Sequence, residues 1–111
     1  MQNLIPGALR LSIYIGENDK FHHHPLYKVI IEEFRELKVA GASVFRGIYG
    51  FGRKSHLHSA DILRLSTDMP ILIESIDTRE KINEAYDAVK DMISEGIVVI
   101  EEVHVIRIKP D

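Results

Sequence analysis

The 111-residue sequence contains no cysteine. Disulfide bonds, zinc sites with thiolate ligands and cysteine nucleophiles are therefore excluded, and the composition fits a reducing compartment. No apolar run approaches the roughly 20 residues needed to cross a bilayer. The first seven residues also lack the cationic start and apolar core of a signal peptide. We therefore expect a cytoplasmic protein with no membrane insertion.

A strong charge of one sign is missing as well. The chain has 14 lysines and arginines against 17 aspartates and glutamates, for a net charge of −3. Because proteins dedicated to nucleic acids usually carry a basic footprint, this balance argues against DNA or RNA as a partner. Hydrophobic residues at 45% and charged residues at 28% are ordinary globular values. The length predicts a single domain over residues 1–111.

The first third of the chain predicts a strand followed by a helix. Residues 8–15 alternate between apolar and polar side chains, which is the period of a strand with one buried face. Pro25 suits a first helical position, where its missing N–H would be unpaired anyway. Apolar residues then recur at helical spacing up to Leu37. Gly41 stands where we expect the chain to leave this helix.

Three further strands are predicted over residues 42–49, 71–76 and 97–108. The alternation of the last strand slips at Glu101 and Glu102, where we expect a bulge or a bend.

A second helix is predicted between the third and fourth strands. Asp77 and Glu80 have the spacing of a capping box, with aspartate in place of the usual serine or threonine. An apolar stripe runs from Ile82 to Ile93, and Gly96 ends the helix.

The order of elements is β-α-β-β-α-β, which predicts an α+β, ferredoxin-like fold with a four-stranded antiparallel sheet. A minimal version would join its second and third strands by a short hairpin. Here about twenty residues, 50–69, separate them, and long connections in compact domains are usually functional or disordered. Residues 59–65 inside this connection fit either a strand extension or a short helix.

The same connection opens with a run of glycine and cationic residues, from Gly50 to His56. Glycine lets the backbone approach a ligand closely, and the adjacent cations Arg53 and Lys54 supply charge for an anion such as phosphate. A second cationic pair, Arg107 and Lys109, closes the last strand. Two separated basic elements in an acidic chain indicate a local anion site rather than a general polyanion surface.

Histidines offer a competing metal hypothesis. Neutral imidazoles are common metal ligands, but adjacent histidines such as those of residues 22–24 rarely converge on one ion. His56 and His58 share a face if their segment is extended, with Asp61 nearby, and a mobile polar loop is the simpler interpretation. His104 is most simply a sheet histidine at a subunit interface.

Two charged residues interrupt predicted strands. Arg46 is either exposed, paired across a subunit boundary or in contact with a ligand. Glu74 belongs to the less buried face of its strand or faces a ligand cleft. No serine has a recognisable nucleophile context and no carboxylate pair has an acid–base spacing, so we expect no enzyme.

Several segments resemble known proteins. Residues 41–53 resemble the entry to the T-loop of PII signalling proteins, and the end of the chain, residues 105–109, is similar to their C-terminal strand. Residues 12–17, 25–27, 46–52 and 68–71 resemble a PII-like family of unassigned function. This second resemblance covers residues 8–108.

The resemblance implies a trimer that binds adenine nucleotides in the clefts between subunits. Gly50, Gly52 and Arg53 would lie against the nucleotide from one chain, and Arg107 and Lys109 would contact the phosphates. Two unpaired sheet edges also favour a closed three-fold oligomer with its sheets facing inward. No obligatory cofactor is implied beyond the nucleotide as a ligand.

The sequence departs from PII proteins in two places. Residues 94–98 lack the cations that follow the second helix in that family, which favours AMP or ADP over ATP. Residues 53–69 contain no tyrosine, so uridylylation is not supported. We expect this loop to be the most mobile segment and to relay the nucleotide state to an unknown protein partner. The alternatives are a divalent-metal-binding trimer resembling ion-tolerance proteins and a ligand-free oligomeric module.

Overall fold

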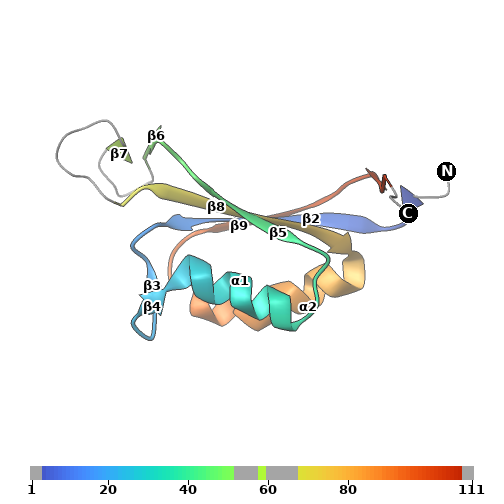
Figure 1. Cartoon of the computed structure of the whole chain (residues 1–111), viewed down its shortest axis with the longest axis horizontal. Coiled ribbons are helices and arrows are strands. Elements are labelled where there is room, and N and C mark those ends of the chain that lie inside the picture. The colour runs from blue at the N-terminus through green and yellow to red at the C-terminus, as the bar shows by residue number, and fades with distance from the viewer. Residues whose placement is uncertain (1–3, 52–57, 60–67, 109–111) are drawn as a thin grey trace.

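The computed structural model describes residues 4–51 and 68–108 and the backbone of residues 58–59 (Figure 1). Its main sheet has four antiparallel strands in the order β5-β8-β2-β9, which are Ala42–Arg46, Pro70–Thr78, Ala8–Gly16 and Ile97–Glu102. Helices α1 (Leu26–Glu36) and α2 (Arg79–Val89) both lie on one side of this sheet. The predicted α+β, ferredoxin-like architecture is confirmed.

Short elements complete the described part of the chain. The pairs are β1 (Leu4–Ile5) with β10 (Val105–Ile106), β3 (Lys20–Phe21) with β4 (His24–Pro25), and β6 (Tyr49–Gly50) with β7 (His58–Ser59). A 3-10 turn, η1 (Lys90–Met92), follows α2. In the part of the chain that the structure describes, no helix is long and apolar enough to cross a membrane.

The core lies between the sheet and the helices. Strand β2 turns alternate residues toward the helices, and these are almost fully buried, as the period-two pattern predicts. The helices supply the other side of the core at i, i+4 and i, i+3 spacing. The main core residues are Leu9, Leu11, Ile13, Ile15, Leu26, Ile30, Phe34, Ile71, Ile73, Ile82, Ala85 and Val89.

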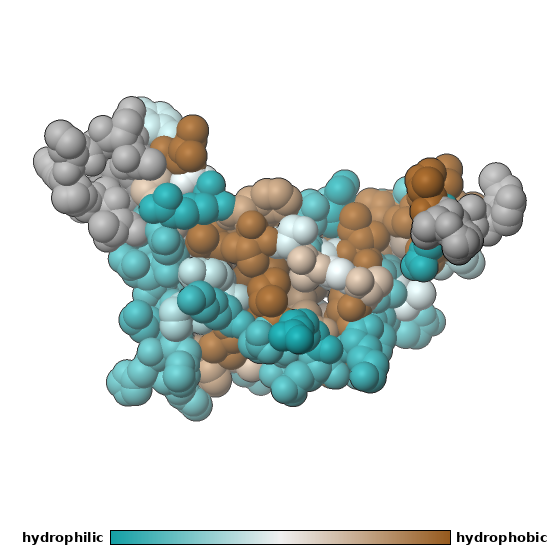
Figure 2. Space-filling view, viewed as in Figure 1, coloured by the Kyte–Doolittle hydropathy of each residue, from teal (hydrophilic) through white to brown (hydrophobic). Residues whose placement is uncertain are grey.

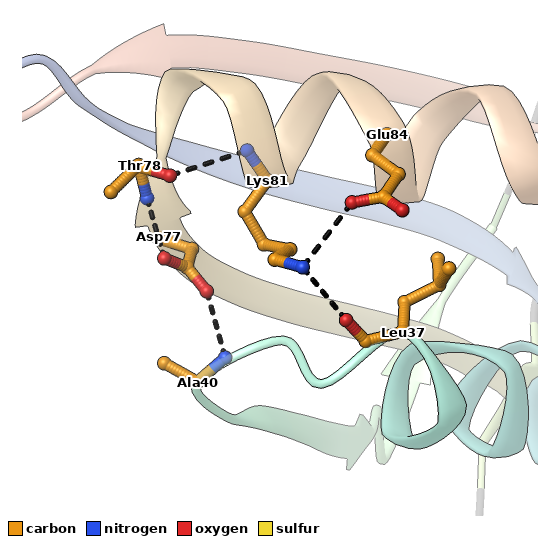
Figure 3. A network of polar contacts seen from close by, with 6 residues as sticks. All are labelled: Leu37, Ala40, Asp77, Thr78, Lys81 and Glu84. Carbon is orange, nitrogen blue, oxygen red and sulfur yellow. Dashed lines mark hydrogen bonds and ion pairs between the residues drawn. The ribbon is translucent and has the colours of Figure 1, made fainter.

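The predicted cap of α2 is wrong by one residue. The N-cap is Thr78, whose hydroxyl accepts a hydrogen bond from the Lys81 N–H at 3.2 Å. The Asp77 carboxylate instead accepts from the N–H of Thr78 at 2.7 Å and from the N–H of Ala40 at 2.8 Å (Figure 3). The Lys81 ammonium donates to the Leu37 carbonyl at 2.8 Å. Hydrogen bonds of Asp77 and Lys81 therefore connect the segment between α1 and β5 to the start of α2.

Both predicted ends of α1 also need correction. Pro25 precedes the helix as its N-cap residue, and Leu26 is the first helical position. At the other end the left-handed residue is Lys38, with φ of 63°, rather than Gly41. The N–H of Lys38 donates to the Arg35 carbonyl, and the N–H of Val39 donates to the Phe34 carbonyl. These two hydrogen bonds form a Schellman motif. A lysine thus occupies the position that glycine usually fills.

Two strands end earlier than predicted. The second strand of the sheet stops at Arg46, and Tyr49 and Gly50 pair separately with β7. The last strand breaks at Val103 and His104, one to two residues beyond the predicted bend, and the Val103 N–H donates to Ala8. The chain then pairs with β1 instead of continuing along β2. His104 is therefore an exposed residue between strands, not a residue within the sheet.

The sheet face away from the helices is partly apolar. On β2 it carries Arg10 and Tyr14, which pair in register with Glu101 and Ile97 of β9. Arg10 forms ion pairs with Glu101 at 3.5 Å and with Glu74 at 4.0 Å, so Glu74 lies on the less buried face as predicted. Figure 2 shows brown surface along the strand layer, whereas the helical layer below it is mostly teal. The large apolar residues exposed on this face are Tyr14, Phe45, Ile97 and Val99.

Candidate functional site

The predicted nucleotide-binding residues fall at two ends of the molecule. β6, which contains Gly50, lies at one end of the long axis, and the C-terminal end of the described chain lies at the other (Figure 1). Arg46 ends β5 opposite Ile71 and belongs to the β6 end, whereas Arg107 follows β10. Gly52, Arg53 and Lys109 lie outside the described residues, as do His56 and Asp61. The structure therefore brings Arg46 and Gly50 together and separates both from Arg107 of the same chain.

Pro70 lies beside two glycines, Gly47 and Gly50. The N–H of Gly47 donates to the Pro70 carbonyl at 2.7 Å, where β5 ends. A Cβ atom on Gly47 would stand 2.7 Å from Cγ of Pro70, closer than real contacts allow, whereas one on Gly50 would stand 3.5 Å away. Packing against Pro70 therefore requires glycine at Gly47 but not at Gly50. The approach of Gly50 to a ligand stays a prediction. The sequence contained no signal that distinguished the two glycines.

Arg46 is paired within its own chain. Its Nε donates to Oε1 of Glu17 at 3.0 Å, with the arginine side chain half exposed and the glutamate about one-quarter exposed. The structure thus adds an ion pair within one chain to the partial exposure of Arg46. Pairing across a subunit boundary and contact with a ligand stay predictions. Sequence reasoning missed Glu17 because 29 residues separate the two partners.

The turn that carries Glu17 also holds the chain where it re-enters the sheet. The N–H of Glu17 donates to the Met69 carbonyl at 2.8 Å, and the N–H of Asn18 donates to Oδ1 of Asp68 at 2.9 Å. A Cβ atom on Gly16 would stand 2.9 Å from the same Asp68 oxygen, so glycine permits this approach. The Met69 side chain is fully buried. Residues 16–18 thus fix both Arg46 and the segment that leads into β8.

At the opposite end, Arg107 is exposed and forms no hydrogen bond or ion pair with any residue that the structure describes. It follows the two-residue pairing of Leu4 with Ile106 and of Ile5 with Val105. Leu4, Ile106 and Ile108 beside it are exposed apolar residues. Figure 2 shows brown surface at this end of the molecule. A free guanidinium next to exposed apolar surface can bind an anion supplied from outside the chain.

The histidine hypothesis gains no support from the geometry. His22 and His23 form the two-residue turn between β3 and β4, and both adopt positive φ, 51° and 71°. The ring of His22 stacks on Phe21 with centroids 4.0 Å apart. Within residues 4–51 and 68–108, no group of three histidine, cysteine or acidic side chains is arranged to hold a metal ion.

A depression of about 330 Å³ lies at the start of β5, lined by Ala40, Ser43, Glu74 and Ile76 among others. It contains an acidic residue and no cation, so its charge does not suit phosphate. None of the predicted nucleotide-binding residues lines it.

Comparison with solved structures defines the class of fold. CPII, a nitrogen regulatory PII-like protein from Thiomonas intermedia K12 solved with ADP, AMP and bicarbonate, aligns with a TM-score of 0.69 at 16% identity. The alignment covers 94% of this chain and 92% of CPII. GlnK of B. subtilis aligns with a TM-score of 0.54 at 12% identity over 86% of this chain and 84% of GlnK. The fold is that of PII-like proteins.

Sequence comparison identifies the family. Residues 8–105 match the model of DUF190, described as Uncharacterized ACR, COG1993, and the chain belongs to this family. The UPF0166 protein MJ1524 of Methanocaldococcus jannaschii is 35% identical over 98 residues, 87% of this chain and 90% of that protein. A UPF0166 protein of Aquifex aeolicus is 32% identical over 96 residues, 86% of this chain and 90% of its own length. The resemblance to a PII-like family of unassigned function is confirmed.

The contact between Gly47 and Pro70 gives a test of the site's framework. The variant Gly47→Ala should lower the free energy of unfolding by about 1–3 kcal/mol, because a methyl group would overlap the rigid proline ring. Gly41→Ala is the matched control, since a Cβ atom at that position would have nothing within 4 Å. Urea unfolding followed by circular dichroism at equal protein concentration measures both. Equal stability of the two variants would contradict the close packing at Pro70.

Proposed function

We propose that this protein is a cytoplasmic PII-like regulatory protein that binds an adenine nucleotide between the subunits of a homotrimer. This proposal rests on one observation: the end of β5 and β6, which carry Arg46 and Gly50, lies at the opposite end of the long axis from the C-terminal segment that carries Arg107 (Figure 1). One chain cannot bring these groups to one phosphate. A second copy can complete the site by presenting its Arg107 to the end that carries Arg46 and Gly50.

The open sheet face supports the trimer. Its exposed apolar residues, with the paired Arg10 between them, form a surface of the kind that a second copy covers. Strands β5 and β9 are the two edges of the sheet, and such edges are normally covered or paired. Three copies with their sheets turned inward cover the apolar face and close the assembly.

The nucleotide preference follows from the number of cations. Gly50 and Gly52 let the backbone approach the ligand, while Arg46, Arg53, Arg107 and Lys109 supply the positive charge for its phosphates. Residues 94–98 add no cation, so the site favours AMP or ADP over ATP. The PII-like protein CPII was solved with ADP and AMP, which supports this ligand class for the fold.

The output of this protein is a binding event rather than a reaction. We expect no catalysis, because no serine in the sequence has a recognisable nucleophile context and a regulatory role needs none. In this proposal the nucleotide biases the conformations of residues 53–69, and a protein partner recognises the result.

The first prediction from the proposed function concerns assembly. The variant Val99→Glu should reduce the mass measured by light scattering from three chains to one at micromolar concentration, because it places a charge on the apolar sheet face. Asn83→Glu adds the same charge on the exposed side of α2 and should leave the trimer intact. A monomeric mass for the unmodified protein would contradict both the proposed trimer and the proposed site between subunits.

The second prediction concerns the phosphate-binding cations. Arg107→Ala should weaken AMP and ADP binding by about 1.5–3 kcal/mol, the range for hydrogen bonds to charged groups. Lys109→Ala should cost less, because an ammonium is a point charge on a flexible stem. Arg35→Ala, on the exposed surface of α1, is the control and should bind normally. Calorimetry that found unaltered binding in the Arg107 variant would contradict the proposed site.

The third prediction concerns the relay. Trypsin should cut first after Arg53 or Lys54, and saturating AMP or ADP should slow this cut. The reason is that a nucleotide held at Gly52 and Arg53 restricts the backbone that the protease must bind. Digestion after Arg35, which lies on α1, serves as the internal control. Equal cleavage rates at Arg53 with and without nucleotide would show that nucleotide binding does not alter residues 53–69, which would contradict the relay.

A further inference from the structure

Arg46 already holds an anion from its own chain. Its Nε lies 3.0 Å from Oε1 of Glu17, and both side chains are in contact with solvent. A carboxylate and a phosphate are recognised by the same guanidinium geometry. Glu17 therefore occupies the position on Arg46 that a phosphate oxygen would take, or stands close enough to repel a phosphate on the other edge of the guanidinium.

The two other carboxylates of this turn region have different partners. Oδ2 of Asp19 accepts a hydrogen bond from the N–H of Gly16 at 3.0 Å, and Oδ1 of Asp68 accepts one from the N–H of Asn18. These two carboxylates hold the backbone of the turn, whereas the Glu17 side chain holds Arg46. Glu17 is thus the carboxylate of this group that is held by Arg46 rather than by the backbone of the turn.

Glu17 also links Arg46 to the start of β8. Its own N–H donates to the Met69 carbonyl at 2.8 Å, and its neighbour Asn18 binds Asp68. Arg46 ends β5, and Asp68 and Met69 stand directly before β8. One residue therefore contacts the last position of one strand and the segment that enters the next.

We propose that Glu17 is a positioning residue that competes with the ligand's phosphate for Arg46 and couples phosphate binding to the Asp68–Met69 segment. This inference rests on the proposed nucleotide site and adds a residue and a mode of regulation to it. When the phosphate binds Arg46, Glu17 is displaced, and the hydrogen bonds of Glu17 and Asn18 to the strand entrance weaken. Glu17 thus lowers the affinity of the site for phosphate, and its displacement transmits occupancy of the site to the Asp68–Met69 segment.

The variant Glu17→Gln tests the competition, because it removes the charge and keeps the shape. Its affinity for AMP, ADP and pyrophosphate, measured by calorimetry, should rise about twofold to fivefold, as expected for release of a partly exposed ion pair. Arg46→Ala should bind more weakly, and Glu17→Gln should then give no gain in the Arg46→Ala background. Glu32→Gln, which removes the partner of Arg35 on α1, is the matched control and should leave affinity unchanged.

Amide hydrogen exchange tests the coupling. In the unmodified protein, saturating ADP should speed exchange at the amides of Glu17 and Asn18. In Glu17→Gln these rates should respond less to ADP, a result that a purely structural role of Glu17 would not produce. Unchanged rates in the unmodified protein would overturn the coupling.

The outcomes separate this inference from the proposed function. If nucleotides bind but Glu17→Gln shows equal or weaker affinity, the competition is wrong and the nucleotide site stands. If AMP and ADP fail to bind while pyrophosphate binds the variant more tightly, the competition stands and the nucleotide proposal fails. If pyrophosphate and both nucleotides bind neither protein, Arg46 is not an anion site and the inference is overturned.

Discussion

The antiparallel pairing of β2 with β8 is the constraint on which the other contacts depend. It runs without a slip from Ala8 opposite Thr78 to Gly16 opposite Pro70. Because side chains alternate with a period of two, a shift by one residue would turn the buried set of β2 toward solvent. The same register delivers Asp77 and Thr78 to the start of α2 at one end and places Gly16 against Asp68 at the other. Helix docking and site geometry are thus two consequences of one register.

The two faces of the sheet differ in how they are covered. The helices bury one face of the two central strands, and the contacts of Asp77 with Ala40 and of Lys81 with Leu37 hold the helical layer in place (Figure 3). The other face combines exposed apolar side chains with the ion pairs of Arg10. A charged pair inside an apolar surface disfavours arbitrary association, since a wrong partner would leave the charges buried and unpaired. In the proposed trimer, this face therefore requires a facing surface of matching chemistry.

The sequence predicted elements better than it predicted the ends of elements. Strand and helix periods are local, so the order and the core of β2 could be predicted. The choice of Thr78 over Asp77 as the cap depends on Ala40, which lies 37 residues from Asp77 and binds its carboxylate. Lys38 in a left-handed conformation could not be expected while Gly41 stood nearby, since most residues avoid that region.

The sequence supplied candidate residues for a site but not their arrangement. Glycines and cations indicated an anion site, and the comparison with PII-like proteins defined the class of its fold. The partner of Arg46 could not be inferred, because Glu17 belongs to a different turn and no local pattern joins them. The separation of Arg107 from Gly50 follows from the antiparallel register, since β9 begins opposite Tyr14 and runs away from the end of β2 that carries Gly16. Contacts between distant segments carry this information, and one sequence does not reveal them.

The bridge between β1 and β10 closes the chain almost into a ring. Leu4 faces Ile106 and Ile5 faces Val105, so the pairing joins the two ends of the described chain. Because β2 and β9 already pair as far as Leu9 and Glu102, this bridge extends a ladder whose segments lie side by side. Only two residues on each side form it, and Leu4 and Ile106 are exposed. A short pairing with few buried contacts opens locally at a low free-energy cost, and Arg107 follows directly after it.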